Sequence, residues 1–201
     1  MSAVEPATRS GAGPSDAALV VAARAGEAWA REALFRRYAP LVNGLALRLL
    51  GRDADVDDLV QDSFVQALRS LASLDAPAAF ASWISSIVVR TCSKLLRRRQ
   101  LLRRLGLYRG EGPVDLDAIV SRAAPPDVAA ELSAIYAVLE DLPSDVRVAL
   151  VLRRVEGQSL EEIAAATGAS FATIKRRVAA GERRLQQALL PVRLPREKSG
   201  P

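Results

Sequence analysis

The chain of 201 residues is long enough for two small domains or one of medium size, and its composition, 50% hydrophobic but only 4% aromatic, favours helices over sheets. The absence of histidine and the presence of one cysteine exclude histidine-based acid–base catalysis, Cys/His zinc sites and an intrachain disulfide. Lysine and arginine (28) outnumber aspartate and glutamate (23), and the resulting charge of +5 is compatible with nucleic-acid binding.

The N-terminal stretch, residues 1–15, is small, polar and contains proline, which is typical of a disordered tail. It has no apolar region of the kind that a secretory signal peptide requires. The longest apolar runs, such as residues 17–23, are much shorter than the roughly 20 residues that span a bilayer. We therefore expect a cytoplasmic protein without membrane insertion.

Four amphipathic helical patterns follow between residues 16 and 100. They cover residues 16–25, ended by Gly26; residues 27–50, ended by Gly51; a third segment that starts near Asp53, which can cap it; and a fourth that starts after Pro77. The apolar stripes of the last three are Ala33, Leu34, Tyr38, Leu41, Val42, Leu45 and Leu49; Val56, Leu59, Val60, Phe64, Ala67 and Leu68; and Phe80, Trp83, Ile84, Ile87, Val88, Thr91 and Leu95. Such helices can bury a common core, in which Cys92 should be a small filler.

Acidic residues are concentrated at the start of the third helix, as Asp53, Asp55, Asp57, Asp58 and Asp62. Acids in the first turn complement the helix dipole, which accounts for Asp55 and Asp57 without any partner. Asp58 and Asp62 lie one turn apart with Gln61 between them, and this pair favours contact with a basic protein partner. A metal site is not expected, because no further oxygen ligands accompany these carboxylates.

The fourth helix has a basic outward face. This face carries Arg90, Ser93, Lys94 and Arg97, and the basic run 97–99 extends it. Such a face suits the phosphate backbone of a nucleic acid. Phe80 and Trp83 stand at the start of the helix, after the loop 73–79, where they could stack on unpaired bases or pack in the core.

Residues 101–127 contain three glycines and three prolines and lack a sustained period, which predicts a flexible inter-domain linker with a transient turn near residues 116–121. Helical patterns then resume at residues 128–141, 144–156, 160–167 and 171–190, before a loose basic tail at 191–201. The predicted fold is all-α, with two small helical domains at residues 16–100 and 128–190.

A helix-turn-helix pattern occupies the second domain. Ser159 and Glu162 form a capping box, Gly168 can adopt the positive φ of the turn, and Ser170 can cap the next helix. The positions expected to face inward are Ile163, Ala164, Ile174 and Val178. The exposed side of the second helix carries Thr173, Lys175, Arg176, Arg177, Arg183 and Arg184, which can reach guanine edges or phosphates. The alternative is a plain helical hairpin with a solvated basic face.

Three groups of motif residues follow one another along the chain. The first is 33–40 (ALFRRYAP) with 49–51 (LLG); the second is 55–64 (DVDDLVQDSF), 80–84 (FASWI) and 95–99 (LLRRR); the third is Leu142-Pro143, Arg147, Glu156-Gly157, 162–164 (EIA) and 172–175 (ATIK). Together they make the chain resemble the extracytoplasmic-function (ECF) sigma factors of the sigma-70 family over about residues 16–190.

The resemblance implies a role for each domain. Residues 16–100 would form sigma region 2, and its helix would dock on core RNA polymerase through Asp57, Asp58, Gln61 and Asp62. The minus-ten promoter element would be melted and bound by Ser73, Leu74, Asp75, Phe80, Trp83, Arg90, Ser93, Lys94 and Arg97. Residues 128–190 would form sigma region 4 and bind the minus-thirty-five element through Ser170, Phe171, Thr173, Lys175, Arg176, Arg177, Ala179 and Arg183. The linker would thread the polymerase, and an anti-sigma factor would be a further partner.

The sequence departs from the family pattern at a few positions. The family often has Asn at Arg90, an acid at Lys94, a basic residue at Ala180 and an aromatic residue at Arg31. The added positive charge at Arg90 and Lys94 should strengthen phosphate contacts and weaken base discrimination.

The function expected is therefore that of a non-enzymatic polymerase subunit, bound to promoter DNA in the nucleoid, with no cofactor, metal, catalytic residue or small-molecule substrate. The alternative is a stand-alone helix-turn-helix regulator, which is disfavoured because no dimerisation helix or ligand domain is apparent. A helical scaffold is disfavoured by the clustered basic faces, and an enzyme by the absence of a glycine-rich phosphate loop and of convergent carboxylates.

Overall fold

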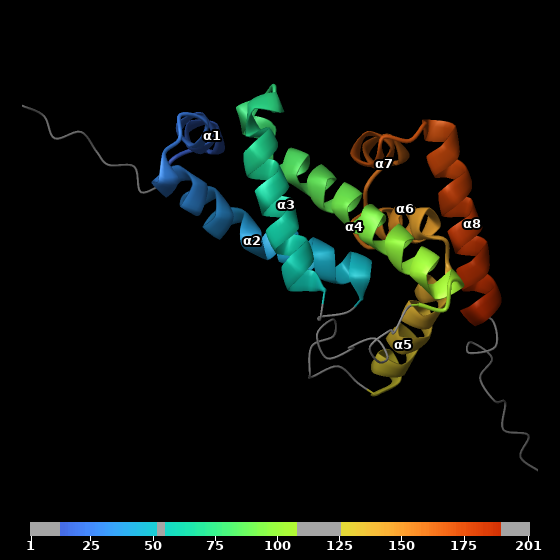
Figure 1. Cartoon of the computed structure of the whole chain (residues 1–201). Helices are drawn as coiled ribbons and strands as arrows, with labels where there is room; N and C mark the ends of the chain where they lie inside the picture. The colour runs from blue at the N-terminus through green and yellow to red at the C-terminus, as the bar shows by residue number, and fades with distance from the viewer. Residues whose placement is uncertain (1–12, 52–54, 108–125, 190–201) are drawn as a thin grey trace, which may run out of the picture.

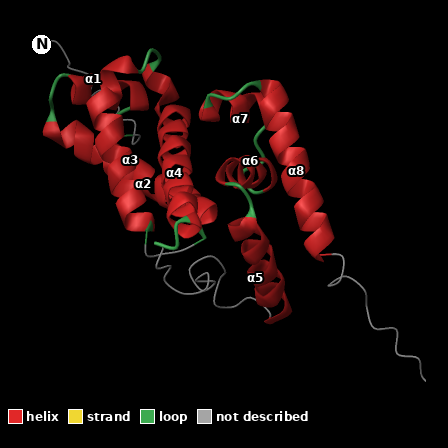
Figure 2. Cartoon of the chain, turned by 45° about the vertical axis from the view of Figure 1, so that its right-hand side comes forward, coloured by secondary structure: helices red, strands yellow, loops and turns green. Residues whose placement is uncertain are grey.

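The computed structural model describes residues 13–51, 55–107 and 126–189, and in these ranges the chain is helical and contains no strand (Figures 1 and 2). The helices are α1 (Asp16–Arg24), α2 (Ala28–Leu50), α3 (Val56–Ser70), α4 (Phe80–Arg104), α5 (Pro126–Asp141), α6 (Ser144–Arg154), α7 (Leu160–Thr167) and α8 (Phe171–Leu189), with short 3₁₀ turns η1 (Leu71–Ser73) and η2 (Pro77–Ala79) between α3 and α4. Residues 1–12 of the expected tail, residues 108–125 of the expected linker with its turn near 116–121, and residues 190–201 lie outside the described residues.

The first four helices pack around one core, as their apolar stripes predict. Ser15 caps α1 by accepting a hydrogen bond from the Ala18 amide (3.2 Å), and Gly51 ends α2 in the left-handed conformation with φ of 63°. Two stripe positions differ from the expectation, since Leu41 and Leu68 are 43% and 38% exposed. They lie at the edge of their stripes, where a neighbouring helix covers only part of each side chain.

Helix α4 is the longest element and extends four residues beyond the expected domain end at residue 100. Its last turn consists of leucine and arginine, which favour helix, and the first breaker is Gly106, with φ of 67°. Cys92 is completely buried in the core, which confirms its expected place. Burial raises the pKa of its thiol to about 12.

The second group of helices is built around α6, of which five consecutive residues, 148–152, are buried. A helix that is buried on all sides is typical of the centre of a bundle; α7 and α8 pack against α6, and α5 packs against α8. The capping box is confirmed: Ser159 Oγ accepts from the Glu162 amide (3.1 Å), and the Glu162 carboxylate accepts from the Ser159 amide (2.7 Å). Gly168 closes α7 with φ of 70°, so the turn forms where the sequence predicts it.

The two helical groups also contact each other, which the sequence did not predict. Helix α4 lies between the first bundle and the second, where it packs against α6 and α7, and the C-terminal end of α2 meets α6 (Figures 1 and 2). Helix α8 lies on the far side of α6 from α4 (Figure 2). This arrangement leaves different faces of α3, α4 and α8 open to solvent.

Candidate nucleic-acid and partner interfaces

An acidic face runs along α3. Asp57, Asp58, Gln61 and Asp62 are all exposed. None of the three carboxylates forms an ion pair with another residue in the ranges that the structure describes. Asp55 behaves differently: it precedes α3 without capping it and forms an ion pair with Arg99, while Asp53, the expected cap, lies outside the described residues. The face therefore presents negative charge that no side chain described here neutralises.

A shallow groove adjoins this acidic face between α2 and α3. It is lined by Glu32, Phe35, Arg36, Ala39, Pro40, Asn43, Asp57 and Val60. Phe35 is 48% exposed and its ring lies 4.7 Å from that of Phe64, so an aromatic surface borders the carboxylates. The helix period did not single out Phe35 as a site residue; its signal is a large aromatic side chain next to, but outside, the apolar stripe of α2.

The basic face of α4 is present as predicted at Arg90, Lys94 and Arg97, whose side chains are exposed. Ser93 and Trp83 are partly buried. Ser73, at the end of η1, and Asp75, between η1 and η2, are exposed. Arg98 is exposed as well, whereas Arg99 is 7% exposed. The run 97–99 therefore does not extend the basic face as a whole, because Arg99 turns inward to Asp55.

Two side chains predicted to bind DNA are instead part of the core. Phe80 is 1% exposed and packs between Tyr38 and Trp83, with ring centroids 4.9 and 5.8 Å away. Of the two alternatives for Phe80, stacking on bases or packing in the core, the structure therefore has the second. Leu74 is 4% exposed. Burial of an apolar side chain is lower in free energy than its exposure to water. We therefore leave Leu74 and Phe80 out of the DNA-binding surface.

Two residues that the sequence did not single out hold this region in place. The Arg24 guanidinium donates to the carbonyl oxygens of Leu71 (3.0 Å) and Leu74, which ties α1 to the segment before η2. Asp16 accepts hydrogen bonds from the Tyr38 hydroxyl and from Arg37 (2.6 Å). These contacts join α1 to α2 and to the connection between α3 and α4.

The electrostatics of the Asp16 cluster follow from these bonds. The hydrogen bond from Tyr38 is the main cause that lowers the pKa of Asp16, while burial opposes it and Arg37 adds to the lowering. Burial and the neighbouring carboxylate together raise the pKa of Tyr38 to about 12. The pair is thus held as carboxylate and neutral phenol.

The helix-turn-helix forms a second basic surface. Ser170 Oγ accepts a hydrogen bond from the Thr173 amide (3.3 Å), as expected for the cap of α8. Exposed positions on α8 include Ser170 before it and Phe171, Lys175, Arg176, Arg183 and Arg184 along it, while Thr173 and Ala179 are partly buried. Ile163, Ile174 and Val178 are buried as predicted, and Ala164 is partly buried where the helices cross.

Two features of α8 could not be seen in its sequence. Arg177 is partly buried and forms an ion pair with Asp145 of α6, so its guanidinium points toward the fold. Gly181 is buried against α6: a Cβ atom there would lie 3.0 Å from Leu150 Cδ2 and 3.2 Å from Val146 Cγ1. The close approach of α8 to α6 thus depends on the absence of a side chain at Gly181.

Neither a site for a metal ion nor a membrane-spanning helix is found in the part of the chain that the structure describes. There, no group of three or more Cys, Asp or Glu side chains is arranged to hold a metal ion. None of the described helices has the length and apolar character needed to cross a membrane.

Both helical groups match parts of one known protein family. Residues 34–101 match Sigma-70 region 2, and residues 132–185 match Sigma-70, region 4. The chain is 34% identical over 176 residues to the ECF RNA polymerase sigma factor SigM of Mycobacterium tuberculosis, a match that covers 87% of this chain and 85% of that one. It is 32% identical over 160 residues to the ECF RNA polymerase sigma factor SigE of Mycolicibacterium smegmatis, covering 78% of this chain but only 60% of that longer relative.

A solved structure agrees with the fold. The sigma factor RpoE of Bartonella quintana, in complex with the anti-sigma factor NepR, is similar with a TM-score of 0.58 and 23% identity, over 79% of this chain and 96% of that chain. The two helical domains are those of a sigma-70 protein. The chain belongs to the extracytoplasmic-function RNA polymerase sigma factor family. The comparisons give no support to the alternative of a stand-alone regulator.

Proposed function

We propose that this chain joins core RNA polymerase, directs it to promoters and supports melting of the minus-ten element, with no catalytic activity of its own. The observation that carries the proposal is the separation of three surfaces in a member of the sigma factor family: an acidic face on α3, and basic faces on α4 and α8. One anionic and two cationic surfaces are suited to one basic protein partner and two contacts with a nucleic acid. Such a subunit acts in the cytoplasm, at the nucleoid.

The acidic face is the proposed polymerase-docking surface. Asp57, Asp58, Gln61 and Asp62 present carboxylates and an amide to a basic helical partner, and the exposed ring of Phe35 offers an apolar contact beside them. Interfaces of this kind combine an aromatic anchor with charged groups that set orientation. Because none of these carboxylates forms an ion pair with another residue that the structure describes, docking would break no such ion pair.

The basic face of α4 is the proposed contact with the minus-ten element. Arg90, Lys94 and Arg97 would bind the phosphate backbone, with Ser73, Asp75, Trp83 and Ser93 close to the bases. The partly buried Trp83 rests on Phe80, which holds the indole in place for stacking on an unpaired base. Leu74 and Phe80 support this surface from within the core.

The proposed contact with the minus-thirty-five element is the N-terminal half of α8. In a helix-turn-helix, the first residues of the second helix reach the base edges of the major groove. Here these residues are Ser170, Phe171, Thr173, Lys175 and Arg176, with Arg183 farther along toward the phosphates. Ala179 and Arg177 face the fold and would act through the placement of the helix.

A protein inhibitor is a further proposed partner. The structurally similar RpoE was solved with the anti-sigma factor NepR, and its fold is that of the present chain. The exposed acidic face and the aromatic groove beside it would be the surface for which polymerase and such an inhibitor compete.

The test is an in vitro transcription assay with the purified chain, core polymerase and a library of promoter fragments. Specific transcripts should appear only when chain and core enzyme are both present, and the chain alone should bind the same fragments weakly. Core enzyme alone is the control. Tight, saturable binding of the chain to one DNA site without polymerase, combined with no transcript when both are present, would contradict the proposal.

A further inference from the structure

The connection between α3 and α4 presents two polar side chains to solvent. Ser73 and Asp75 are exposed, whereas Leu74 between them is 4% exposed and anchors the connection in the core. The Ser73 hydroxyl donates to the Ser70 carbonyl (2.7 Å), and the Leu74 amide donates to the Leu71 carbonyl (3.3 Å). Both bonds join residues that are close in sequence, so neither fixes the connection relative to another helix.

Arg24, in the last turn of α1, supplies bonds of longer range. Its guanidinium donates to the carbonyl oxygens of Leu71 (3.0 Å) and Leu74, at the start of η1 and directly after it. Carbonyl oxygens where a helix ends carry the negative end of its dipole, so a cation binds there favourably. Helix α1 also packs against η1 and η2, and Figure 1 shows it beside the end of α3. One side chain of α1 therefore holds the connection just before Asp75.

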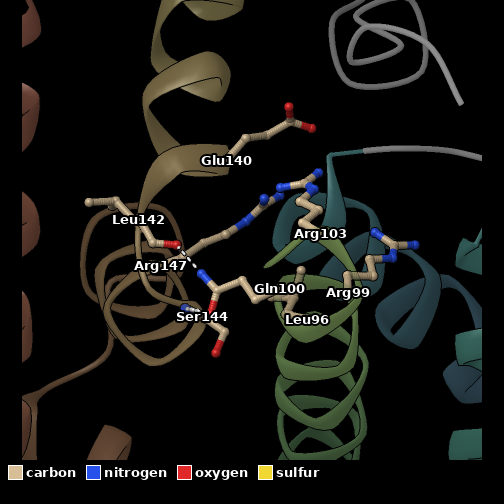
Figure 3. Close-up of a pocket in the computed structure, with 8 residues that line it drawn as sticks. All are labelled: Leu96, Arg99, Gln100, Arg103, Glu140, Leu142, Ser144 and Arg147. Carbon is tan, nitrogen blue, oxygen red and sulfur yellow. Dashed lines mark hydrogen bonds between the residues drawn. The ribbon is translucent and has the colours of Figure 1, made fainter. Parts of the chain in front are cut away.

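Comparable bonds at the other end of α4 have a different effect. There Gln100 of α4 donates to the Leu142 carbonyl (2.8 Å), as Figure 3 shows. In the same pocket, Arg147 of α6 donates to the carbonyl oxygens of Leu49 (3.0 Å) and Leu50 (2.6 Å) at the end of α2. These bonds join elements of different helical groups and lie outside the connection between α3 and α4. Gln100 is therefore a matched control for a side chain that donates to a backbone carbonyl.

From these contacts we infer that Arg24 is a positioning residue for the minus-ten element: it holds the connection in the arrangement in which Ser73 and Asp75 meet an unpaired base. The inference rests on the proposed function for its consequence, whereas the hold on the connection is a property of the free chain. A carboxylate that is fixed in place accepts hydrogen bonds only from bases whose donors match its position. A mobile carboxylate adjusts to several bases and loses more conformational entropy on binding.

The inference separates base selection from overall affinity. The exposed cations Arg90, Lys94 and Arg97 lie on α4, which the two Arg24 bonds do not reach, and they supply the proposed phosphate contacts. The salt dependence of binding should therefore be the same with and without Arg24. Selection among bases should depend on Arg24, because base contacts and not phosphate contacts carry sequence information.

The first measurement follows the connection in the free chain. A nitroxide label at Ala76→Cys occupies an exposed position of the connection, and the buried Cys92 stays unlabelled. The label should become more mobile in Arg24→Met, which removes both hydrogen bonds and keeps an unbranched side chain. In Arg24→Lys, whose ammonium can keep one of the two bonds, the mobility should lie between those of the native chain and Arg24→Met.

Two controls remove other tethers of the same domain. Arg37→Met removes the ion pair with Asp16, which also joins α1 to the bundle, and Gln100→Met removes the bond at the opposite end of α4. Both should leave the label at Ala76→Cys as immobile as in the native chain. Unchanged mobility in Arg24→Met, or an equal increase in the two controls, would overturn the inference. Where Arg24→Met lowers the helix content, the comparison of Arg24→Lys with the controls decides in the same way.

The second measurement is base selection by the chain in complex with core polymerase. The probe is a pool of single-stranded DNA with randomised positions, sequenced before and after capture by the complex. The native complex should enrich a narrow set of sequences, and Arg24→Met should lower that enrichment by about tenfold, the size of one good base contact, with unchanged salt dependence. Arg37→Met should enrich the same set to the same extent.

The two measurements fail in different ways. Undiminished enrichment by a folded Arg24→Met complex would show that Arg24 does not position the base contacts. Failure of the native complex to form, or to enrich any sequence, would contradict the proposed function instead. The label at Ala76→Cys would still decide whether Arg24 holds the connection in the free chain.

Discussion

Arg177 of α8 forms an ion pair with Asp145 in the first turn of α6, whereas its neighbour Arg176 is exposed and has no ion-pair partner among the residues that the structure describes. Consecutive residues of a helix are turned about 100° from each other, so the two arginines serve different surfaces. Arg177 fixes α8 on α6, and Arg176 is available to DNA. The recognition helix thus contains one positioning arginine and one binding arginine side by side.

The first prediction separates these two roles. Lys175→Ala and Arg176→Ala should each weaken promoter binding by the polymerase complex roughly 10- to 100-fold if they contact bases, or reduce its salt dependence by about one unit of slope if they contact phosphates. Arg177→Ala should instead destabilise the second domain by about 0.5–1 kcal/mol, since its ion pair is partly exposed. Filter binding at several salt concentrations and thermal unfolding measure the two effects. Equal loss of binding in all three variants, without any loss of stability for Arg177→Ala, would contradict the assignment.

The second prediction concerns the acidic face of α3. Asp58→Lys combined with Asp62→Lys should abolish co-purification with core polymerase, because like charges would then meet across the interface. The thermal midpoint should change little, since both side chains are exposed and make no ion pair with the described residues. The matched control is Asp141→Lys, an exposed acid at the end of α5. If the double variant still retains polymerase at moderate salt, docking occurs elsewhere.

The third prediction follows from the pKa values of Asp16 and Tyr38. Because the pKa of Asp16 is lowered on folding, its contribution to stability is present above its unfolded value of 3.8 and is lost as the pH falls below that value. Tyr38 is the opposite case: its pKa rises from 10.0 to about 12, so its contribution is present below pH 10 and is lost between about pH 10 and 12.

Tyr38→Phe should therefore lower the free energy of unfolding by about 1–2 kcal/mol near neutral pH. It should also make the loss of stability smaller at both acid and alkaline pH. Chemical unfolding across the pH range measures this, with Tyr108→Phe as a control that keeps the native Tyr38. An unchanged alkaline limb in Tyr38→Phe would show that another group titrates there.

The fourth prediction tests the contact between α8 and α6. Gly181→Val should destabilise the second domain by about 1–3 kcal/mol, because the added carbons would overlap the buried Leu150 and the partly buried Val146. Promoter binding should fall together with stability, since α8 would be displaced from its seat. Urea unfolding followed by circular dichroism measures the change, and Ala188→Val, at an exposed position of the same helix, is the control. Equal stability of Gly181→Val and Ala188→Val would contradict the prediction, because α8 would then move away from α6 without loss of unfolding free energy.

Local signals account for most of what could be predicted. Ser159 and Glu162 cap α7 with the groups expected of them, and Gly51 and Gly168 end their helices at positive φ, since caps and glycines act within a few residues of themselves. The burial of Ile163, Ile174 and Val178 follows from periodicity in the same way. Exposure of the acidic face on α3 required nothing beyond the helix period.

The fate of individual side chains at helix boundaries could not be predicted. The two readings of Phe80 were left open because a stacking aromatic and a core aromatic have the same spacing; only the rings of Tyr38 and Trp83 around it decide for the core. Arg98 and Arg99 are adjacent and chemically identical, yet Arg99 is buried and paired with Asp55 while Arg98 is exposed. A sequence pattern contains no information about which partner arrives from another element.

The sequence by itself determined the helices, their two groups and the family, because capping, helix period and motif order are set by residues near one another in the chain. Only the tertiary structure decided that Arg147 caps α2, that Arg177 faces α6 and that α4 lies between the two domains. These contacts join residues that are far apart in sequence. Their free energy depends on burial and on exact partner geometry, which no local pattern of residues specifies.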